Sequence, residues 1–325
     1  MSDFLNLVYF LVPLIIASMV PLAIVALGGL FSESTGVINI ALEGIMIMGA
    51  FVGIVIMRLL VLNENITIGL QWIAALGLLI GAIFGALYAA LHAFAAINMK
   101  SNQIISATAL NLFAPALSVF VARFYFGTSN LNLGGNYLIR SVPLLSSIPV
   151  LGRLFFTNVF LSTYIGIGIF SVAIVILFKT RLGLRMRSCG ENPHAADALG
   201  INIYKIRYTG VLISGALAGM GGVIFVLSFA TRFSGTVSGF GFLALAVMIF
   251  GQWNPKKILM AALFFATIRV VSSAYAGIPV LQDLNVPVEI YQMLPYLATL
   301  VVLAFASKNS RAPKAIGEPF DQGKR

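Results

Sequence analysis

Runs of apolar residues alternate with short polar segments along the whole chain. A helix needs about 20 apolar residues to cross the hydrocarbon of a bilayer. By that criterion the pattern predicts nine spans, at residues 8–29, 42–61, 70–97, 103–121, 158–178, 207–230, 240–253, 256–274 and 288–306. The seventh is the shortest, and we expect a tilted or discontinuous helix there. The predicted fold class is all-α, a polytopic transmembrane helix bundle.

The composition supports a membrane protein. Hydrophobic residues make up 60% of the 325 residues, charged residues make up 9%, and the mean hydropathy is +1.01. A soluble domain has about 25% charged residues, so most of this chain must be solvated by lipid. The single cysteine, Cys189, excludes an internal disulfide framework. Together with His92 and His194 it forms no recognisable metal-ligand spacing, so we expect no metal site.

The distribution of basic residues predicts the orientation. The net charge is +10, but the Lys and Arg residues lie mostly between apolar runs, and no nucleic-acid partner is expected. Most of the Lys and Arg residues lie on one side of the membrane if that side holds residues 98–102, 179–206, 254–257 and 307–325. The positive-inside rule makes that side cytoplasmic. With nine spans, the N-terminus is then outside and the C-terminus is cytoplasmic.

This topology divides the chain into a transmembrane domain, 1–306, and a cytoplasmic tail, 307–325. The domain includes an external loop, 122–157, and a polar cytoplasmic loop, 179–206. The start of the chain lacks a basic n-region and a small-residue cleavage site, so we interpret the first apolar run as a retained helix.

Two segments resemble each other at an offset of 202 residues. Residues 31–51 align with 233–253 without gaps, and the identities include Phe31 with Phe233 and Ser32 with Ser234. The topology gives the two copies opposite orientations, which predicts an inverted repeat of four-helix halves whose interface holds the substrate path. In both copies Ser, Thr and Gly interrupt the apolar stretch, and irregular backbone at membrane depth needs solvation by protein or water. The alternative is a pair of ordinary surface loops.

The cytoplasmic loop contains a short helix with both ends marked in the sequence. Asn192 suits the N-cap, Pro193 suits the first helical position, and Gly200 suits the left-handed position after the last turn. The predicted helix, 192–199, is too short to be stable alone in water, so it needs a surface to pack on. That surface belongs either to a partner or to the chain's own bundle. His92 is an ionisable group inside a predicted span, and we expect a hydrogen-bonded neutral imidazole.

The loop Lys179–Arg207 resembles the segment by which permease subunits of ATP-binding-cassette importers grip their ATPase. Three further stretches resemble the branched-chain amino acid, ribose and nucleoside permeases, in particular the nucleoside subgroup that works with lipoprotein receptors of the basic-membrane-protein type. They are LGGLFSESTGVINIALEG at 27–44, NQII at 102–105 with ALN at 109–111, and GFGFLALAVMIFGQWNP at 239–255. The likeness covers most of 20–305, whereas the tail matches nothing that we can name.

The resemblance implies an importer with several partners: a second permease subunit, ATP-binding-cassette ATPase domains, an external substrate-binding lipoprotein, and membrane lipid. It implies no cofactor on this chain, because ATP and Mg would bind the partner ATPase. The external loop ends in residues 148–156, a stretch also familiar in the subgroup, and would lie on the receptor side. Relatives commonly have a ten-helix core, and a missing first helix fits nine spans.

The resemblance also selects candidate site residues. Those expected to contact the ATPase are Gly190, Glu191, Asn192, Pro193, Ala195, Ala196, Ala198 and Gly200. For a nucleoside path we expect uncharged hydrogen-bonding groups beside aromatic rings. The candidates are Phe31, Ser32, Asn39, Asn102, Asn111, Phe240 and Gln252. Each asparagine has an alternative role, a hydrogen bond between helices.

Other function classes find less support in the sequence. The chain has no G-x-x-x-x-G-K-[ST] phosphate loop, so ATP hydrolysis would take place on another chain. A secondary transporter driven by an ion gradient needs ionisable groups in mid-membrane, and the candidates are Glu43 and His92. An intramembrane enzyme needs a nucleophile–base pair or a metal site, and neither is visible. The residues do not distinguish a nucleoside from a sugar or an amino acid as the substrate.

Overall fold

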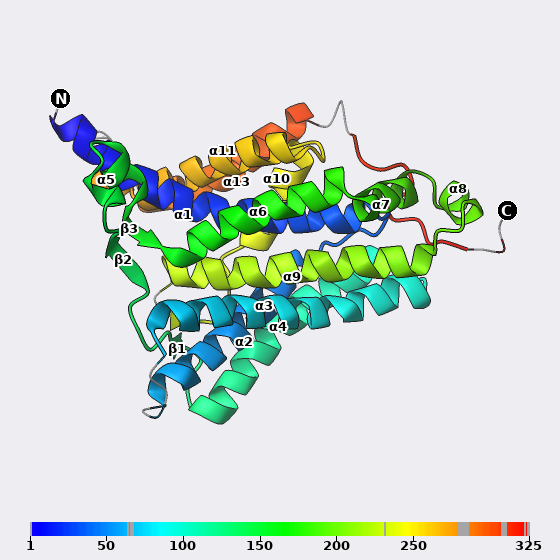
Figure 1. The fold of residues 1–325 in the computed structure, drawn as a ribbon, viewed down its shortest axis with the longest axis horizontal. Helices are drawn as coiled ribbons and strands as arrows, with labels where there is room; N and C mark the ends of the chain where they lie inside the picture. Colours follow the sequence, from blue (N-terminus) through cyan, green and yellow to red (C-terminus); the bar gives the residue numbers. More distant parts are fainter. Residues whose placement is uncertain are drawn as a thin grey trace.

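The computed structural model describes residues 2–63, 65, 68–230, 232–278, 286–306, 311–321 and 323. These residues form a bundle of helices that lie roughly along its longest axis (Figure 1). The long helices are α1 (Ser2–Glu33), α2 (Leu42–Leu62), α3 (Leu70–Ala93), α4 (Gln103–Phe126), α6 (Leu161–Lys179), α9 (Ile203–Phe229), α11 (Pro255–Ser273) and α13 (Val288–Ala306). The helix α3 continues into a π-helical turn, η1 (Phe94–Asn98).

Shorter elements lie at the two ends of the bundle and within it. At one end are α5 (Leu151–Phe155), the 3₁₀ turn η2 (Leu145–Ser147), and two small antiparallel sheets. These sheets pair β1 (Leu131–Asn132) with β4 (Arg232–Phe233), and β2 (Leu138–Ser141) with β3 (Thr157–Phe160). At the other end are α7 (Arg181–Glu191) and α8 (Pro193–Ala198) (Figure 1). The remaining elements are α10 (Phe240–Phe250) and η3 (Tyr275–Gly277).

The all-helical membrane fold is confirmed at this level. Within the described residues, six helices are long and apolar enough to cross a membrane: Leu5–Glu33, Leu42–Leu62, Leu70–Asn98, Gln103–Phe126, Leu161–Lys179 and Ile203–Phe229. The seventh predicted span contains α10, which has 11 residues. At 1.5 Å per residue it is about 16 Å long, roughly half of the hydrocarbon thickness. The helix alone therefore does not cross the membrane.

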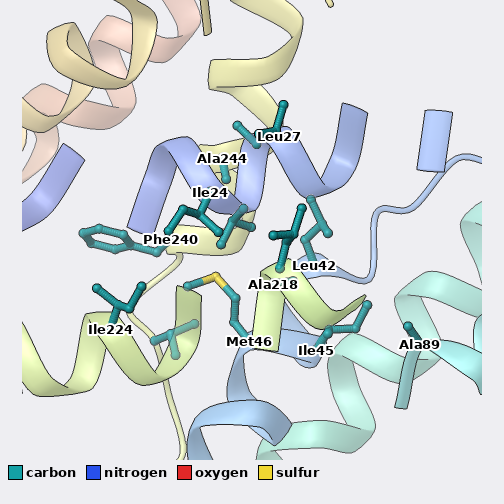
Figure 2. Close-up of a cluster of buried hydrophobic side chains, with 14 of the residues drawn as sticks. Ile24, Leu27, Leu42, Ile45, Met46, Ala89, Ala218, Ile224, Phe240 and Ala244 are labelled. Carbon is teal, nitrogen blue, oxygen red and sulfur yellow. The ribbon is translucent and has the colours of Figure 1, made fainter. Parts of the chain in front are cut away.

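The short α10 packs one face inside the bundle. Figure 2 shows Phe240 and Ala244 of α10 together with Ile24 and Leu27 of α1 and Ile224 of α9. In this cluster Phe240 is 1% exposed and the other four side chains are at most 1% exposed as well. One face of the helix thus packs against protein, whereas Phe242 and Ile249 are 50% and 39% exposed. The buried backbone groups at its ends must find their hydrogen-bond partners in other parts of the chain.

Glycines bring α2, α3 and α9 into direct backbone contact. A Cβ at Gly49 of α2 would lie 2.3 Å from Cα of Gly219 in α9, and a Cβ at Gly85 of α3 would lie 2.3 Å from the Gly215 carbonyl oxygen. Apolar side chains gain little from leaving lipid for protein, so helix association in a membrane depends on close packing of this kind.

We expect Gly219→Ala to destabilise the bundle, because its Cβ would lie 2.1 Å from the backbone oxygen of Gly81. Overpacking at such a position costs about 1–3 kcal/mol. The thermal unfolding midpoint of detergent-purified protein should fall. Gly168→Ala is the matched control, since nothing lies within 4 Å of a Cβ there in α6. An equal midpoint for the two variants would contradict the packing argument.

Candidate functional site

The first feature of the site is a buried break between α1 and α2. Residues 34–41 leave the helical path, although almost all of them are buried. Their backbone finds side-chain partners on neighbouring helices: Gln103 Oε1 accepts from Ile38 N at 2.7 Å, and His92 Nε2 donates to Ile38 O at 2.8 Å. The other His92 nitrogen, Nδ1, lies 3.0 Å from Ser106 Oγ. The predicted hydrogen-bonded imidazole is present, and its role is to hold the break.

Two of the asparagines proposed for the substrate path also hold this break. Asn111 of α4 donates from Nδ2 to Ile40 O at 2.9 Å, and its Oδ1 accepts from Gly44 N at 2.8 Å. Asn39 is fully buried, and its Nδ2 donates to Ser214 Oγ of α9 at 2.9 Å. Both side chains therefore join separate parts of the chain by hydrogen bonds. This is the alternative role, in place of substrate contact, that we considered for each asparagine.

A second break meets the first one. After β4 the chain runs through the non-helical residues 234–239 before α10 begins. Here the Glu43 carboxylate of α2 accepts from Gly239 N at 2.9 Å and from Gly241 N at 2.7 Å. These amides lie at the N-terminus of α10, where a negative charge also interacts favourably with the helix dipole. Segments 31–43 and 233–245, related by the offset of 202, are thus in direct contact.

The other end of α10 is held by a second carboxylate. Trp253 follows α10, and its Nε1 donates to Glu33 Oε2 at 2.6 Å. Glu33 is the last residue of α1 and is 5% exposed. The helix α10 is therefore fixed at one end by the start of α2 and at the other by the end of α1.

A cavity of about 460 Å³ lies between α1, α9, α10 and α11. Ligand sites commonly have volumes of about 300–1,000 Å³. Phe240, one of the predicted path residues, lines it. Beside Phe240 is Arg269 of α11, whose guanidinium carbon lies 4.5 Å from the Phe240 ring centroid and whose Nη2 donates to Ser238 O at 3.2 Å. The sequence analysis did not select Arg269, although an arginine inside a predicted span was a signal that could have identified it.

The other path candidates lie away from this cavity. Ser32 donates from Oγ to Val37 O at 2.7 Å, inside the first break, and Phe31 is fully buried. Asn102 is the N-cap of α4 and accepts from the amides of Ile104 and Ile105. Gln252 has a positive φ of 49°, and its Oε1 accepts from Lys257 Nζ at 2.7 Å. The structure thus gives most of the candidates local or structural partners.

The short helix predicted at residues 192–199 is confirmed as α8, Pro193–Ala198. Asn192 Oδ1 accepts from Ala195 N at 3.0 Å, Pro193 occupies the first turn, and Gly200 has a φ of +80°. The sequence analysis missed α7, the amphipathic helix that precedes α8 and ends at Glu191. The chain bends between α7 and α8 at Asn192, which has an extended backbone conformation.

The residues around α8 fall into two groups by exposure. Gly190, Pro193 and Ala196 are buried against the chain itself, and a Cβ at Gly190 would lie 2.4 Å from Ser34 O. The residues of the second group are exposed on the surface of the chain. This group comprises Glu191, Asn192, His194, Ala195, Ala198, Leu199 and Gly200. Leu199 is 83% exposed, so the outward face of α8 includes a large apolar side chain that has no cover from the described part of the chain.

The C-terminal segment 311–321 connects this loop to the first break. Ala315 N donates to Gly190 O, and Gly317 N donates to Gly36 O, both at 2.9 Å. The Phe320 ring packs with its centroid 5.2 Å from that of His194. Nothing in the sequence of the tail predicted these contacts, because the partners are separated from it by more than a hundred residues.

Three charged side chains and one thiol complete this region. Arg207, 2% exposed, donates from Nη1 to Glu318 O at 2.9 Å, and Lys314 Nζ lies 3.1 Å from Glu191 Oε1. Burial raises the pKa of the Cys189 thiol, so this cysteine stays protonated at neutral pH. The tail, the loop and the break thus form one packed unit at the end of the bundle opposite to α5 (Figure 1).

Several known proteins similar to this chain are named as ABC transporter permeases. The nucleoside ABC transporter permease protein NupC of Lactococcus lactis subsp. cremoris is 40% identical over 310 residues, 94% of each chain. The guanosine ABC transporter permease protein NupQ of Bacillus subtilis is 38% identical over 325 residues, 99% of this chain and all of the relative. The nucleoside ABC transporter permease protein NupB of L. lactis is 30% identical over 171 residues, 47% of this chain and 45% of the relative. No solved structure shows a significant match.

The relatives agree with the structure in describing a multi-pass membrane protein that is not itself an enzyme. The family model described as branched-chain amino acid transport system / permease component matches residues 12–303. This range begins in α1 and ends in α13, so it includes both breaks, α8 and all of the cavity lining except Phe10. The chain therefore belongs to the family of branched-chain amino acid transport system permease components.

Proposed function

We propose that this chain is the permease subunit of an ATP-binding-cassette importer and forms half of the translocation path for a nucleoside. The observation that carries the proposal is the similarity to NupC and NupQ over nearly the whole length of each chain. Their names state a nucleoside and guanosine as the substrates. A related purine or pyrimidine compound belongs to the same class.

The proposed partners follow from the same relatives. An ATPase binds ATP and Mg and docks on α8, a lipoprotein receptor delivers the substrate on the opposite side, and a second permease chain completes the path. NupB, a second permease from the same organism as NupC, supports a heterodimer of related permeases. The loop between α4 and α6 lies at the end of the bundle away from α8, which suits a receptor contact (Figure 1).

An ion-gradient mechanism receives less support from the geometry. Glu43 and His92 were the residues with the right chemistry to carry a coupling ion. Both carboxylate oxygens of Glu43 accept backbone hydrogen bonds, and both His92 nitrogens have partners. An ion carrier needs a group that is free to exchange protons or metal ions with water. These two residues hold backbone segments instead.

The substrate is tested by uptake. Cells that lack this chain should lose ATP-dependent accumulation of labelled inosine and uridine and recover it when the intact chain is restored. Replacing the phosphate-loop lysine of the partner ATPase should abolish uptake while leaving the permease in the membrane, since that lysine contacts the nucleotide phosphates. Accumulation of glucose or leucine in place of nucleosides would contradict the proposed substrate.

The outward face of α8 is tested with bulky substitutions. Ala195→Trp and Ala198→Trp should leave the bundle folded, because both side chains are exposed, but should reduce ATPase co-purification and uptake by about tenfold or more, as is typical for residues at the centre of an interface. Ala196→Trp is the contrasting variant, since Ala196 is 2% exposed and its replacement should lower the amount of folded protein. Full uptake by the Ala195 and Ala198 variants would refute the assignment of this face.

We further propose nine crossings with an inverted repeat, an outside N-terminus and a cytoplasmic C-terminus. The seventh crossing consists of the non-helical residues 234–239 followed by α10. The contacts of Glu43 with Gly239 and Gly241 support the repeat, as does the 5.8 Å separation between the Phe51 and Phe233 ring centroids. In this arrangement, break 34–41 enters from the cytoplasm and break 234–239 from the outside.

Cysteine labelling tests the opposite orientations. In a Cys189→Ala background, the exposed Ser234→Cys should react in intact cells with a membrane-impermeant maleimide. Ile38→Cys, which is next to Gly317 of the tail, should react only in inside-out vesicles. Asn39 and Gly241 are unsuitable positions, because the first makes a buried hydrogen bond and a Cβ at the second would lie 2.4 Å from the Glu43 backbone. Labelling of both cysteines from one side would contradict the repeat.

A further inference from the structure

The cavity between α1, α9, α10 and α11 has a mixed aromatic and polar lining. Its residues come from the first half of α1, the end of α9, the start of α10 and the end of α11, so it lies in the same half of the molecule as β4, at the proposed external side. The lining combines aromatic rings, one guanidinium and several hydroxyl groups. The residues that matter for the argument are Phe10, Ser18, Phe229, Ser238, Phe240 and Arg269.

Two of these aromatic rings are open and the third is covered. Phe10 is 49% exposed and Phe229 is 38% exposed, and both line the cavity. Phe240 is 1% exposed and carries the Arg269 guanidinium against its ring. A planar heterocycle gains favourable stacking on an exposed aromatic ring, whichever base it is. The open rings therefore suit the base of a nucleoside without selecting among bases.

Arg269 supplies the selective element. Its position is fixed by the Phe240 ring and by the Ser238 carbonyl, and the Tyr296 side chain also interacts with it. A guanidinium has five N–H donors, so donors remain after these contacts. In the described part of the chain no carboxylate lies within ion-pair distance of this guanidinium. The Glu43 carboxylate interacts electrostatically with the guanidinium from beyond that distance. The Ser18 hydroxyl, which also lines the cavity, is buried and has no hydrogen-bond partner among the described residues.

The pairing preferences of arginine indicate which base fits. Guanine and hypoxanthine present two adjacent acceptors, O6 and N7, which a guanidinium contacts with two hydrogen bonds. Adenine presents a donor in place of O6, and pyrimidines have no N7. We infer that this cavity binds the base of a 6-oxopurine nucleoside, with Arg269 donating to O6 and N7 and Phe229 stacking on the base. The inference rests on the proposed nucleoside import.

The test compares nucleosides in cells that contain the complete importer. Arg269→Gln should lower the maximal uptake rate of inosine and guanosine about tenfold, within the range expected for loss of one bidentate contact to a base, while adenosine and uridine change by less than about twofold. Arg269→Lys should act in the same direction, because lysine keeps the charge but not the fork geometry. Maximal rates are compared because the external receptor determines the apparent affinity.

Two control variants separate the site from general damage. Arg232→Gln removes an exposed arginine at the same end of the bundle that does not line the cavity, and it should change no uptake rate. Phe229→Leu should lower the uptake of all nucleosides alike, whereas Phe113→Leu, an exposed ring on α4, should not. Immunoblots of the membrane fraction report the amount of each variant. If Arg269→Gln is absent from the membrane, the Arg269→Lys result decides.

The outcomes are distinguishable from failure of the proposed function. Nucleoside uptake with unchanged selectivity in both Arg269 variants, or an equal loss for all nucleosides, would overturn the inference and leave nucleoside import standing. A wild-type importer that accumulates no nucleoside would refute the proposed function, and this inference with it. Selective loss of 6-oxopurine uptake in the Arg269 variants, with Arg232→Gln unaffected, would support the assignment.

Discussion

A non-helical backbone at membrane depth must find hydrogen-bond partners in the protein or in water, because lipid tails offer no donors or acceptors. The break at residues 34–41 imposes this requirement on the whole bundle. Its carbonyl and amide groups are satisfied by Gln103, His92 and Asn111 and by the amide of Gly317 in the tail. Polar residues on α3 and α4 would be energetically unfavourable in a membrane without hydrogen-bond partners. Here they are stabilised by their hydrogen bonds to the break. The positions of those helices and of the tail follow from the break.

The second break is stabilised in a related way, with backbone donors and a side-chain acceptor. Glu43 belongs to the first turn of α2 and accepts from the amides that begin α10. Since Trp253 at the far end of α10 contacts Glu33, both ends of this helix depend on residues that flank the first break. The segment 311–321, which contacts both Gly36 and the α7–α8 loop, brings the proposed docking face next to the same break. A continuous series of packed contacts therefore runs from α8 to the cavity wall at Phe240.

Close packing of α2, α3 and α9 gives this polar network a rigid support. Glycines such as Gly49, Gly85 and Gly219 allow backbone contact between these helices, and a methyl group at any of them would separate them. Side chains that hold the break, including His92 on α3 and Ser214 on α9, then lie within hydrogen-bond distance of it. Small residues and polar groups therefore act together, the first by bringing helices close and the second by joining them.

The sequence by itself determined what depends on neighbouring residues. Apolar runs of sufficient length identified the six helices that are long and apolar enough to cross a membrane within the described residues. Asn192, Pro193 and Gly200 identified α8, because a cap involves groups only a few residues apart. The tertiary structure alone decided the length of α10, the structural roles of Asn39 and Asn111, the burial of Ala196 and the contacts of the tail. It also brought Arg269 beside Phe240 in a cavity. These features arise from partners far apart in the chain, such as Glu43 and Gly241, and no local pattern records which distant residues the packing of helices will bring together.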